Sequence, residues 1–335
     1  KIEEIFNLST THIDITTDIF ICISGDIVYS GSLSEFEVAK EFLINLKVKL
    51  ESKFKSVNIV TAPGNHDSLF PKEDDVREAL IAAVYSGKND NVKDGIVASC
   101  SEVQNNYFEF RESFEPSVVN RVSWSNVFDI DSKRIVFKVF NSSLFSTIND
   151  HKEGYGHLLI PSVDHLNEDD RDIVISMLHH PVNWLRQTNM HKMKMFLEKT
   201  SDLILTGHEH MPKSNKTIGN HRKENFYIAA DIGKDNKNNL SFSIITFNDD
   251  ELTLQIRRRS SSFQESDAIE YVRAINLDRY KYPLNSEYFA ELKEMPASVT
   301  HHRKDRLNLD DVFVWPKLKP ISQEDSGVDY DLLKP

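Results

Sequence analysis

Four short segments of the chain are rich in side chains that bind metal ions. They are Gly25-Asp26, Gly64–Asp67, His179-His180 and Gly207–His210. Together they offer carboxylate and amide oxygens and several imidazole nitrogens, a mixture that suits Mn, Fe, Zn or Co better than Ca or Mg. A carboxylate can also bridge two metal ions, and such a pair clamps an in-line attack at phosphorus and activates water. The residue types therefore point to metal-assisted hydrolysis.

Each of these segments follows a short apolar run that is typical of a buried strand in a parallel sheet. The runs are residues 19–24, 57–61, 173–178 and 203–205. Ligands of open α/β sheets collect at the carboxyl ends of the strands, so we expect the four segments to meet at one sheet edge. Helices are predicted at residues 34–55, over most of 73–115 and at 191–199. Further strands are predicted at residues 122–130, 135–140, 226–230, 242–247 and 252–257.

Glycine and proline stand in these segments at positions where a strand is expected to end. Gly25, Gly64 and Gly207 each stand next to a candidate ligand, where a sharp turn must bring the backbone close to the metal. Pro181 comes two residues after His179 and cannot continue a central strand. These glycine and proline residues thus support the prediction that strands end at these points.

The ordered set Gly-Asp, Gly-Asn-His-Asp, His-x-Pro and Gly-His-x-His resembles the signature of the calcineurin-like metallophosphoesterases, over roughly residues 15–250. Any one piece is weak, but the ordered set, with each piece after a predicted strand, is specific. The resemblance implies a four-layer α/β/β/α sandwich with a dinuclear metal centre at the strand ends. His-His-Pro and Gly-His-Glu-His are most similar to the bacterial branch that includes cyclic-nucleotide phosphodiesterases.

The resemblance also implies roles for individual residues. Asp26 resembles the bridging carboxylate; Asn65, His179 and His208 resemble the ligands of one metal, and His210 a ligand of the other. The implied cofactor is a pair of divalent transition metals, with Mn first and Fe, Zn, Co or Ni as alternatives. His66 resembles the catalytic histidine, which contacts the phosphate or protonates the leaving oxygen, and Asp67 would orient it.

Two further residues are candidate substrate contacts. The His-x-Pro spacing favours His179 over its neighbour as the ligand, which leaves His180 as a pocket residue. Asn141 follows a predicted strand and either lines the site or belongs to an ordinary turn. His66 and Asp26 also have structural alternatives, as a structural histidine and as a turn residue.

One part of the family pattern is absent. No Asp-x-His precedes Gly25, and no apolar first strand is present either. We expect that strand to lie upstream of Lys1, so that residues 1–8 form the helix that follows it. The catalytic domain is predicted to span residues 1–258, with a C-terminal extension or connector over 259–335.

Composition limits the possible partners and the compartment. The 335 residues carry a formal net charge of −12, which disfavours general nucleic-acid binding because phosphate contacts come from Lys and Arg. Two cysteines imply no disulfide framework, and no apolar stretch reaches the 18 residues of a membrane span. A cytoplasmic protein without a membrane partner is therefore predicted.

Three functions fit these observations. The first is hydrolysis of a phosphoester by a dinuclear centre, with a phosphodiesterase acting on nucleotides or nucleic acid preferred. The second is a DNA or RNA nuclease, because the repair exonucleases of the superfamily share the motifs. The third is a non-catalytic binding module that lacks the first metal site.

The C-terminal part suggests a regulatory partner. Residues 307–316 form an apolar-containing segment after a basic stretch, and look similar to the connector that precedes the nucleotide-binding module in bacterial immune proteins of the STAND type. The chain would then be the effector of a longer defence protein or complex. The alternative is that residues 307–335 pack back onto the catalytic domain as a strap.

Overall fold

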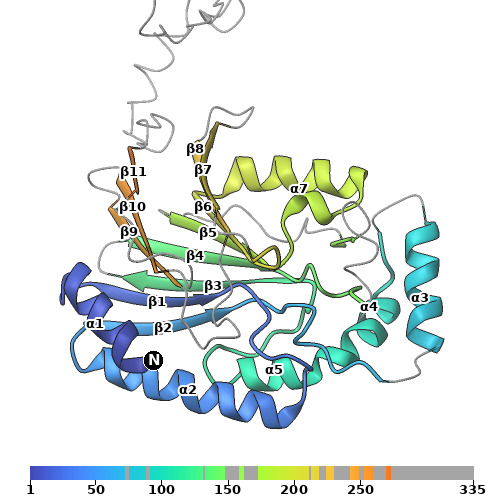
Figure 1. The fold of residues 1–335 in the computed structure, drawn as a ribbon. Coiled ribbons are helices and arrows are strands. Elements are labelled where there is room, and N and C mark those ends of the chain that lie inside the picture. The colour runs from blue at the N-terminus through green and yellow to red at the C-terminus, as the bar shows by residue number, and fades with distance from the viewer. Residues whose placement is uncertain are drawn as a thin grey trace, which may run out of the picture. The chain divides into compact units, whose positions relative to one another are not determined.

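The computed structural model describes most of the first 272 residues of the chain (Figure 1). The described residues are 1–71, 75–87, 91–130, 133–147, 158–161, 173–210, 213–218, 224–229, 242–248, 253–259 and 269–272. All of them fall within the first of the two units into which the chain divides, Lys1–Ile275. Among these residues, no helix has the length and apolar character that crossing a membrane requires. The predicted extension and connector lie largely outside the described residues, so the domain boundary stays a prediction.

The first candidate ligands follow a parallel strand pair. β1 (Asp18–Ile23) pairs in parallel with β2 (Ser56–Thr61), with Ile19 opposite Val57. Helix α2 (Leu33–Glu51) connects them and buries an apolar stripe at helical spacing, formed by Phe36, Leu43, Leu46 and Leu50. Helix α1 (Ile2–His12) precedes β1 and is longer than the predicted residues 1–8. This strand, helix, strand unit places the ends of β1 and β2 side by side.

The other candidate ligands follow strands of a six-stranded sheet with the order β3-β4-β5-β6-β8-β7. Its inner strands are parallel: β4 (Lys133–Phe140), β5 (Ile173–Leu178), β6 (Leu203–Thr206) and β8 (Glu224–Ala229). Its edge strands are antiparallel to their neighbours: β3 (Ser123–Ile130) and β7 (Lys213–Ile218). β9 (Phe242–Asn248), β10 (Thr253–Arg259) and β11 (Ile269–Val272) form a separate antiparallel sheet.

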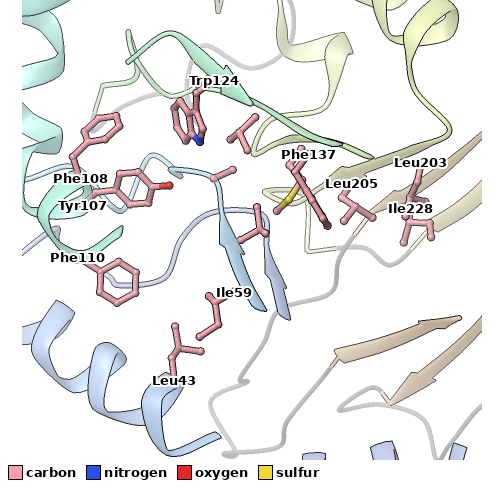
Figure 2. Packing of buried hydrophobic residues seen from close by; sticks show 14 of the residues in the cluster. Leu43, Ile59, Tyr107, Phe108, Phe110, Trp124, Phe137, Leu203, Leu205 and Ile228 are labelled. Atoms are coloured by element: carbon pink, nitrogen blue, oxygen red, sulfur yellow. The ribbon is translucent and has the colours of Figure 1, made fainter. Parts of the chain in front are cut away.

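Two apolar cores define the layers. The first core joins α2, β2 and α5 (Asn105–Arg111) to β3, β4, β5, β6 and β8, as Figure 2 shows for Leu43, Ile59, Phe110, Phe137 and Leu205. The second core joins the six-stranded sheet to α3 (Asp75–Ser86), α4 (Asp94–Ser101) and α7 (Gln187–Thr200), through residues such as Ile81, Cys100, Leu178 and Leu197. Helices therefore cover both outer faces of two facing sheets, which confirms the predicted α/β/β/α sandwich.

A buried ion-pair network fixes the end of β2. The Arg111 and Glu115 side chains are fully buried and lie 3.2 Å apart, and Asn126 of β3 bonds to both of them. The other oxygen of Glu115 accepts hydrogen bonds of 2.9 Å from the backbone N–H and the hydroxyl of Thr61. Thr61 is the last residue of β2, three positions before Gly64. The network thereby holds the strand end from which the Gly64–Asp67 loop departs.

Removal of the buried Glu115 carboxylate should lower the free energy of unfolding far more than removal of an exposed carboxylate. Glu115→Ala leaves the guanidinium of Arg111 buried without its charge partner, which costs about 3–5 kcal/mol in the free energy of unfolding. The matched control is Asp129→Ala, because Asp129 pairs with Arg134 at 2.9 Å on the exposed surface, where such a pair contributes about 0–1 kcal/mol. Denaturant unfolding of both variants measures the difference, and equal losses would contradict the assigned role of the network.

Candidate metal centre

Three candidate ligands converge on a ring nitrogen of a fourth. The Nε2 atom of His179 lies 3.1 Å from Oδ1 of Asn65, 3.2 Å from Nδ1 of His208 and 3.3 Å from Oδ2 of Asp26. These side chains follow β2, β6 and β1, and His179 itself follows β5. The strand ends thus bring together four of the five predicted ligands, from positions up to 182 residues apart in sequence (from Asp26 to His208).

The proton on His179 can be placed from its other nitrogen. Nδ1 lies 2.7 Å from the backbone carbonyl oxygen of Ser24, which can only accept a hydrogen bond, so Nδ1 carries the proton. In the neutral ring, Nε2 then presents a lone pair to Asn65 Oδ1 and Asp26 Oδ2, which also present lone pairs. A hydrogen bond from the far nitrogen of the ring to a carbonyl is the usual arrangement for a metal-binding histidine.

The donor set fits a divalent cation. Two ligand atoms that each lie about 2.1 Å from one ion, at angles between about 90° and 109°, are about 3.0–3.4 Å apart, and the observed separations are 3.1–3.3 Å. One proton on His179 Nε2 could serve only one of the three neighbouring atoms, whereas one cation could bind the lone pairs of all four side chains. The mixture of imidazole, amide and carboxylate suits a transition metal.

Asp26 and His179 shift each other's pKa. Burial raises the pKa of Asp26, but the neighbouring His179 imidazole outweighs this effect and holds the pKa of Asp26 well below its usual range. Burial lowers the pKa of His179, and the Asp26 carboxylate outweighs that effect and raises it. Each group therefore favours the charged state of the other, as expected for an imidazole and a carboxylate 3.3 Å apart.

Close backbone approach makes this convergence possible. A Cβ atom at Gly25, whose φ is +94°, would lie 2.7 Å from Cγ of His179, and a Cβ atom at Gly64 would overlap the Asp26 side chain. Asp26 and His208 adopt the left-handed conformation, with φ of 56° and 65°, which costs a non-glycine residue about 1–2 kcal/mol. Strain of this kind in two ligands is typical of a functional site.

His66 and Asp67 lie beside the ligands but do not bond to each other. The backbone N–H of His66 donates to Oδ1 of Asp26 at 3.0 Å, and its exposed ring bonds through Nδ1 to the backbone carbonyl of Tyr29 at 2.8 Å. The buried Asp67 carboxylate instead accepts from the backbone N–H groups of Gly64, at 2.8 Å, and Val28, at 3.1 Å. The expected orienting contact from Asp67 to His66 is therefore replaced by a backbone carbonyl, while Asp67 joins the two ligand loops.

The carboxyl group of Asp67 has an unusual environment for an acid. Burial, followed by repulsion from the nearby Asp26, raises the pKa of Asp67 to about 7, although the two backbone N–H groups oppose the shift. Nothing in its hydrogen bonding places Asp67 in contact with solvent or substrate. Its position makes it a brace between the Asp26 and Asn65 loops.

The remaining candidates are placed differently. His210 is exposed and left-handed (φ 52°), and within the described part of the chain it forms no hydrogen bond with the other ligands. His180 is fully buried, and one of its ring nitrogens lies within 4.8 Å of a ring nitrogen of His179 and of one of His208. It therefore lies with the candidate ligands, although the sequence assigned it to substrate.

Asn141 has a supporting position. It is fully buried, and its amide nitrogen donates to Oε1 of Gln104 at 2.7 Å and to the backbone carbonyl of Arg121 at 2.9 Å. Its oxygen accepts from the backbone N–H of Ser143 at 3.2 Å. These contacts match the turn alternative and use both ends of the amide, so the structure gives no support to a substrate contact by Asn141.

Trp184 supports the ligand loop and was not singled out from the sequence. Its indole ring lies edge-on to the ring of His208, with centroids 4.3 Å apart, and its Nε1 donates to Oε1 of Glu209 at 3.2 Å. Trp184 thus holds two consecutive residues of a strained loop. Its only sequence signal is a tryptophan five residues after His179, which alone predicts nothing more than a core residue.

Comparisons with known proteins agree with this centre. The model of the calcineurin-like phosphoesterases matches residues 1–212, so the chain belongs to the calcineurin-like phosphoesterase family. That family uses divalent metals in a dinuclear site, and its chemistry is metal-dependent phosphoester hydrolysis. A search of the curated proteins finds no match.

Two solved structures are similar over most of this chain, at low identity. A single mutant of Vps29 from Entamoeba histolytica is 10% identical, with a TM-score of 0.31, and the match covers 81% of this chain and 91% of that one. A conserved uncharacterized protein from Streptococcus pneumoniae, described as a predicted phosphoesterase, is 10% identical with a TM-score of 0.28, over 76% of this chain and 97% of that one.

Removal of a ligand should remove metal, whereas removal of His66 should not. We expect Asp26→Ala, Asn65→Ala and His208→Ala to lose bound divalent metal, because each deletes one of the converging lone pairs. His66→Ala deletes none of them, and should keep its metal while any hydrolytic rate falls by about 10²–10⁴-fold. Elemental analysis after gel filtration measures the metal content. Equal metal loss in His66→Ala would show that its ring is a ligand.

The support from Trp184 can be tested with a second tryptophan as the control. Trp184→Phe keeps a ring near His208 but deletes the N–H that holds Glu209, and we expect an affinity for Mn about 10–100-fold lower. Trp124→Phe is the matched control, because Trp124 is also buried but packs in the first core, and its Nε1 has no partner among the described residues. Competition with a chelating dye measures both affinities. An unchanged affinity in Trp184→Phe would rule out the role.

Proposed function

We propose that this protein is a phosphodiesterase that acts on nucleotides or nucleic acid through a pair of divalent transition metals. The observation that carries the proposal is the convergence of Asp26, Asn65 and His208 on Nε2 of His179 within 3.3 Å. A divalent cation held at that point would activate water for attack at phosphorus. The proposal takes Mn as the first candidate, with Fe, Zn, Co and Ni as alternatives.

Other roles in the proposed reaction are assigned to individual residues of the chain. Asp26, Asn65, His179 and His208 would hold one cation, and His180 lies close enough to join them. Asp26 would also face a second cation, for which His210 is the proposed ligand. His66 is exposed beside Asp26, and its Nδ1 is engaged by the Tyr29 carbonyl. Its Nε2 is then the atom that would donate a proton to a phosphoryl or leaving oxygen.

Two alternatives remain as outcomes of the same tests. A nuclease effector of a larger defence protein would use the same centre on a polymer, and the net charge of −12 opposes binding of a long polyanion. The other alternative is a non-catalytic binding module, which an absence of the Asp-x-His motif from the gene would support. The proposed regulatory partner, a nucleotide-binding module, rests on residues outside the described part of the chain.

Metal removal and substrate choice test the proposal together. Exhaustive chelation should abolish hydrolysis of bis(p-nitrophenyl) phosphate, and Mn should restore it, whereas Ca should not because it prefers all-oxygen sites. The metal-loaded protein is then compared on cyclic nucleotides and on labelled single- and double-stranded DNA. Full activity after chelation would overturn the metal requirement. Metal binding without turnover of any of these substrates would favour the binding module.

A further inference from the structure

Tyr29 is an exception among the aromatic residues of the chain. Every other Phe, Tyr or Trp whose side chain the structure describes is buried or half-buried, whereas the side chain of Tyr29 is 79% exposed. It lies three residues after Asp26, between β1 and α2. An aromatic ring left in water next to a candidate metal centre contributes little to folding, so its position calls for another explanation.

The Tyr29 ring already stacks on one side. Its centroid lies 5.2 Å from that of the His66 imidazole, at an interplanar angle of 23°. The backbone carbonyl of Tyr29 accepts the hydrogen bond from Nδ1 of His66. The two residues therefore form one unit, in which backbone and ring of Tyr29 both contact the proposed catalytic histidine.

The backbone on both sides of Tyr29 is fixed. The N–H of Val28 donates to Oδ1 of the buried Asp67 at 3.1 Å, and the N–H and hydroxyl of Ser30 donate to Oε2 of Glu35 at 2.9 and 2.7 Å. Glu35 belongs to the first turn of α2. An exposed ring on a fixed base loses little conformational entropy when a ligand stacks on it.

We propose that Tyr29 and His66 form a stacking platform for the nucleobase of the substrate. The inference rests on the proposed function, and it names the substrate class as nucleotides. The backbone N–H of His66 bonds to Asp26, so a phosphate held at the metal centre lies next to the platform. Every base has a π-face that can stack on an aromatic ring, whereas a phosphoester with an aliphatic alcohol gains nothing from the ring. A single platform takes one base, which suits a nucleotide or a chain end.

Binding of two matched ligands tests the platform without the need for turnover. AMP and ribose 5-phosphate share the phosphate and the ribose and differ in the base. Calorimetry on the Mn-loaded full chain, with phosphate release monitored, should show tighter binding of AMP. Tyr29→Leu should raise the dissociation constant of AMP by about 5- to 150-fold and leave that of ribose 5-phosphate unchanged. Tyr29→Phe keeps the ring and should keep the preference for AMP.

The outcomes separate the platform from the proposed function. Equal affinity for AMP and ribose 5-phosphate in the unaltered protein, or no binding of either, would overturn the platform. If Tyr29→Leu lowers the affinity for AMP and for ribose 5-phosphate equally, Tyr29 only positions His66. If Tyr29→Phe also lowers the affinity for AMP, the effect belongs to the hydroxyl group and not to the ring. If the platform fails while bis(p-nitrophenyl) phosphate is still hydrolysed, the proposed function stands. If base preference depends on Tyr29 but no diester is hydrolysed, the platform belongs to a binding module.

Discussion

The crowding of four ligand-type side chains around one buried ring nitrogen is the constraint on which the arrangement of the site depends. Around Nε2 of His179 the structure holds polar atoms of Asn65, His208 and Asp26 at 3.1–3.3 Å, while Nδ1 of His179 donates its hydrogen bond to the carbonyl oxygen of Ser24. Removing so many polar groups from water at one point is costly, because buried acceptors need donors or a cation there. The surrounding fold must therefore help to hold the group together.

The fold supplies that restraint in three ways. Parallel strands from two sheets end at one place and deliver the ligands from opposite sides. Glycine at positions 25 and 64 lets the ligand loops touch, and the left-handed backbone at Asp26 and His208 turns their side chains inward. The ion pair of Arg111 and Glu115 fixes the end of β2 through Thr61. The backbone strain in the ligand loops is thus balanced by buried contacts some residues away.

The strand ends and the convergence of the candidate ligands were predictable from sequence because both leave local signals. An apolar run followed by glycine and a polar ligand marks a buried strand and its end, and β5 was predicted residue for residue as 173–178. β7 and β11 were not predicted, since the sequence of β7, Lys213–Ile218, is largely polar and β11 has only four residues. Such edge strands are specified by their neighbours rather than by their own composition.

The contacts that support the site could not be predicted, since most of them involve backbone groups. The carbonyls of Ser24 and Tyr29 orient His179 and His66, and a carbonyl has the same chemistry in every residue type. A hydrogen bond between Asp67 and His66 was expected, but the buried Asp67 carboxylate accepts hydrogen bonds from backbone N–H groups instead. Asn141 was equally ambiguous, because an amide after a strand can face either a ligand or the core.

The carbonyl of Tyr29 also decides which proton His66 can move. A carbonyl oxygen only accepts, so the Nδ1 atom that lies 2.8 Å from it must keep its hydrogen. The neutral ring then presents a bare Nε2 outward, and in that form it can receive a proton or accept a hydrogen bond but cannot donate one. His66 can protonate a departing oxygen only as the imidazolium, whereas the neutral ring would act as a base. Because the Tyr29 carbonyl oxygen keeps the proton on Nδ1, the neutral ring can only accept a proton at Nε2, and the imidazolium can only donate one there.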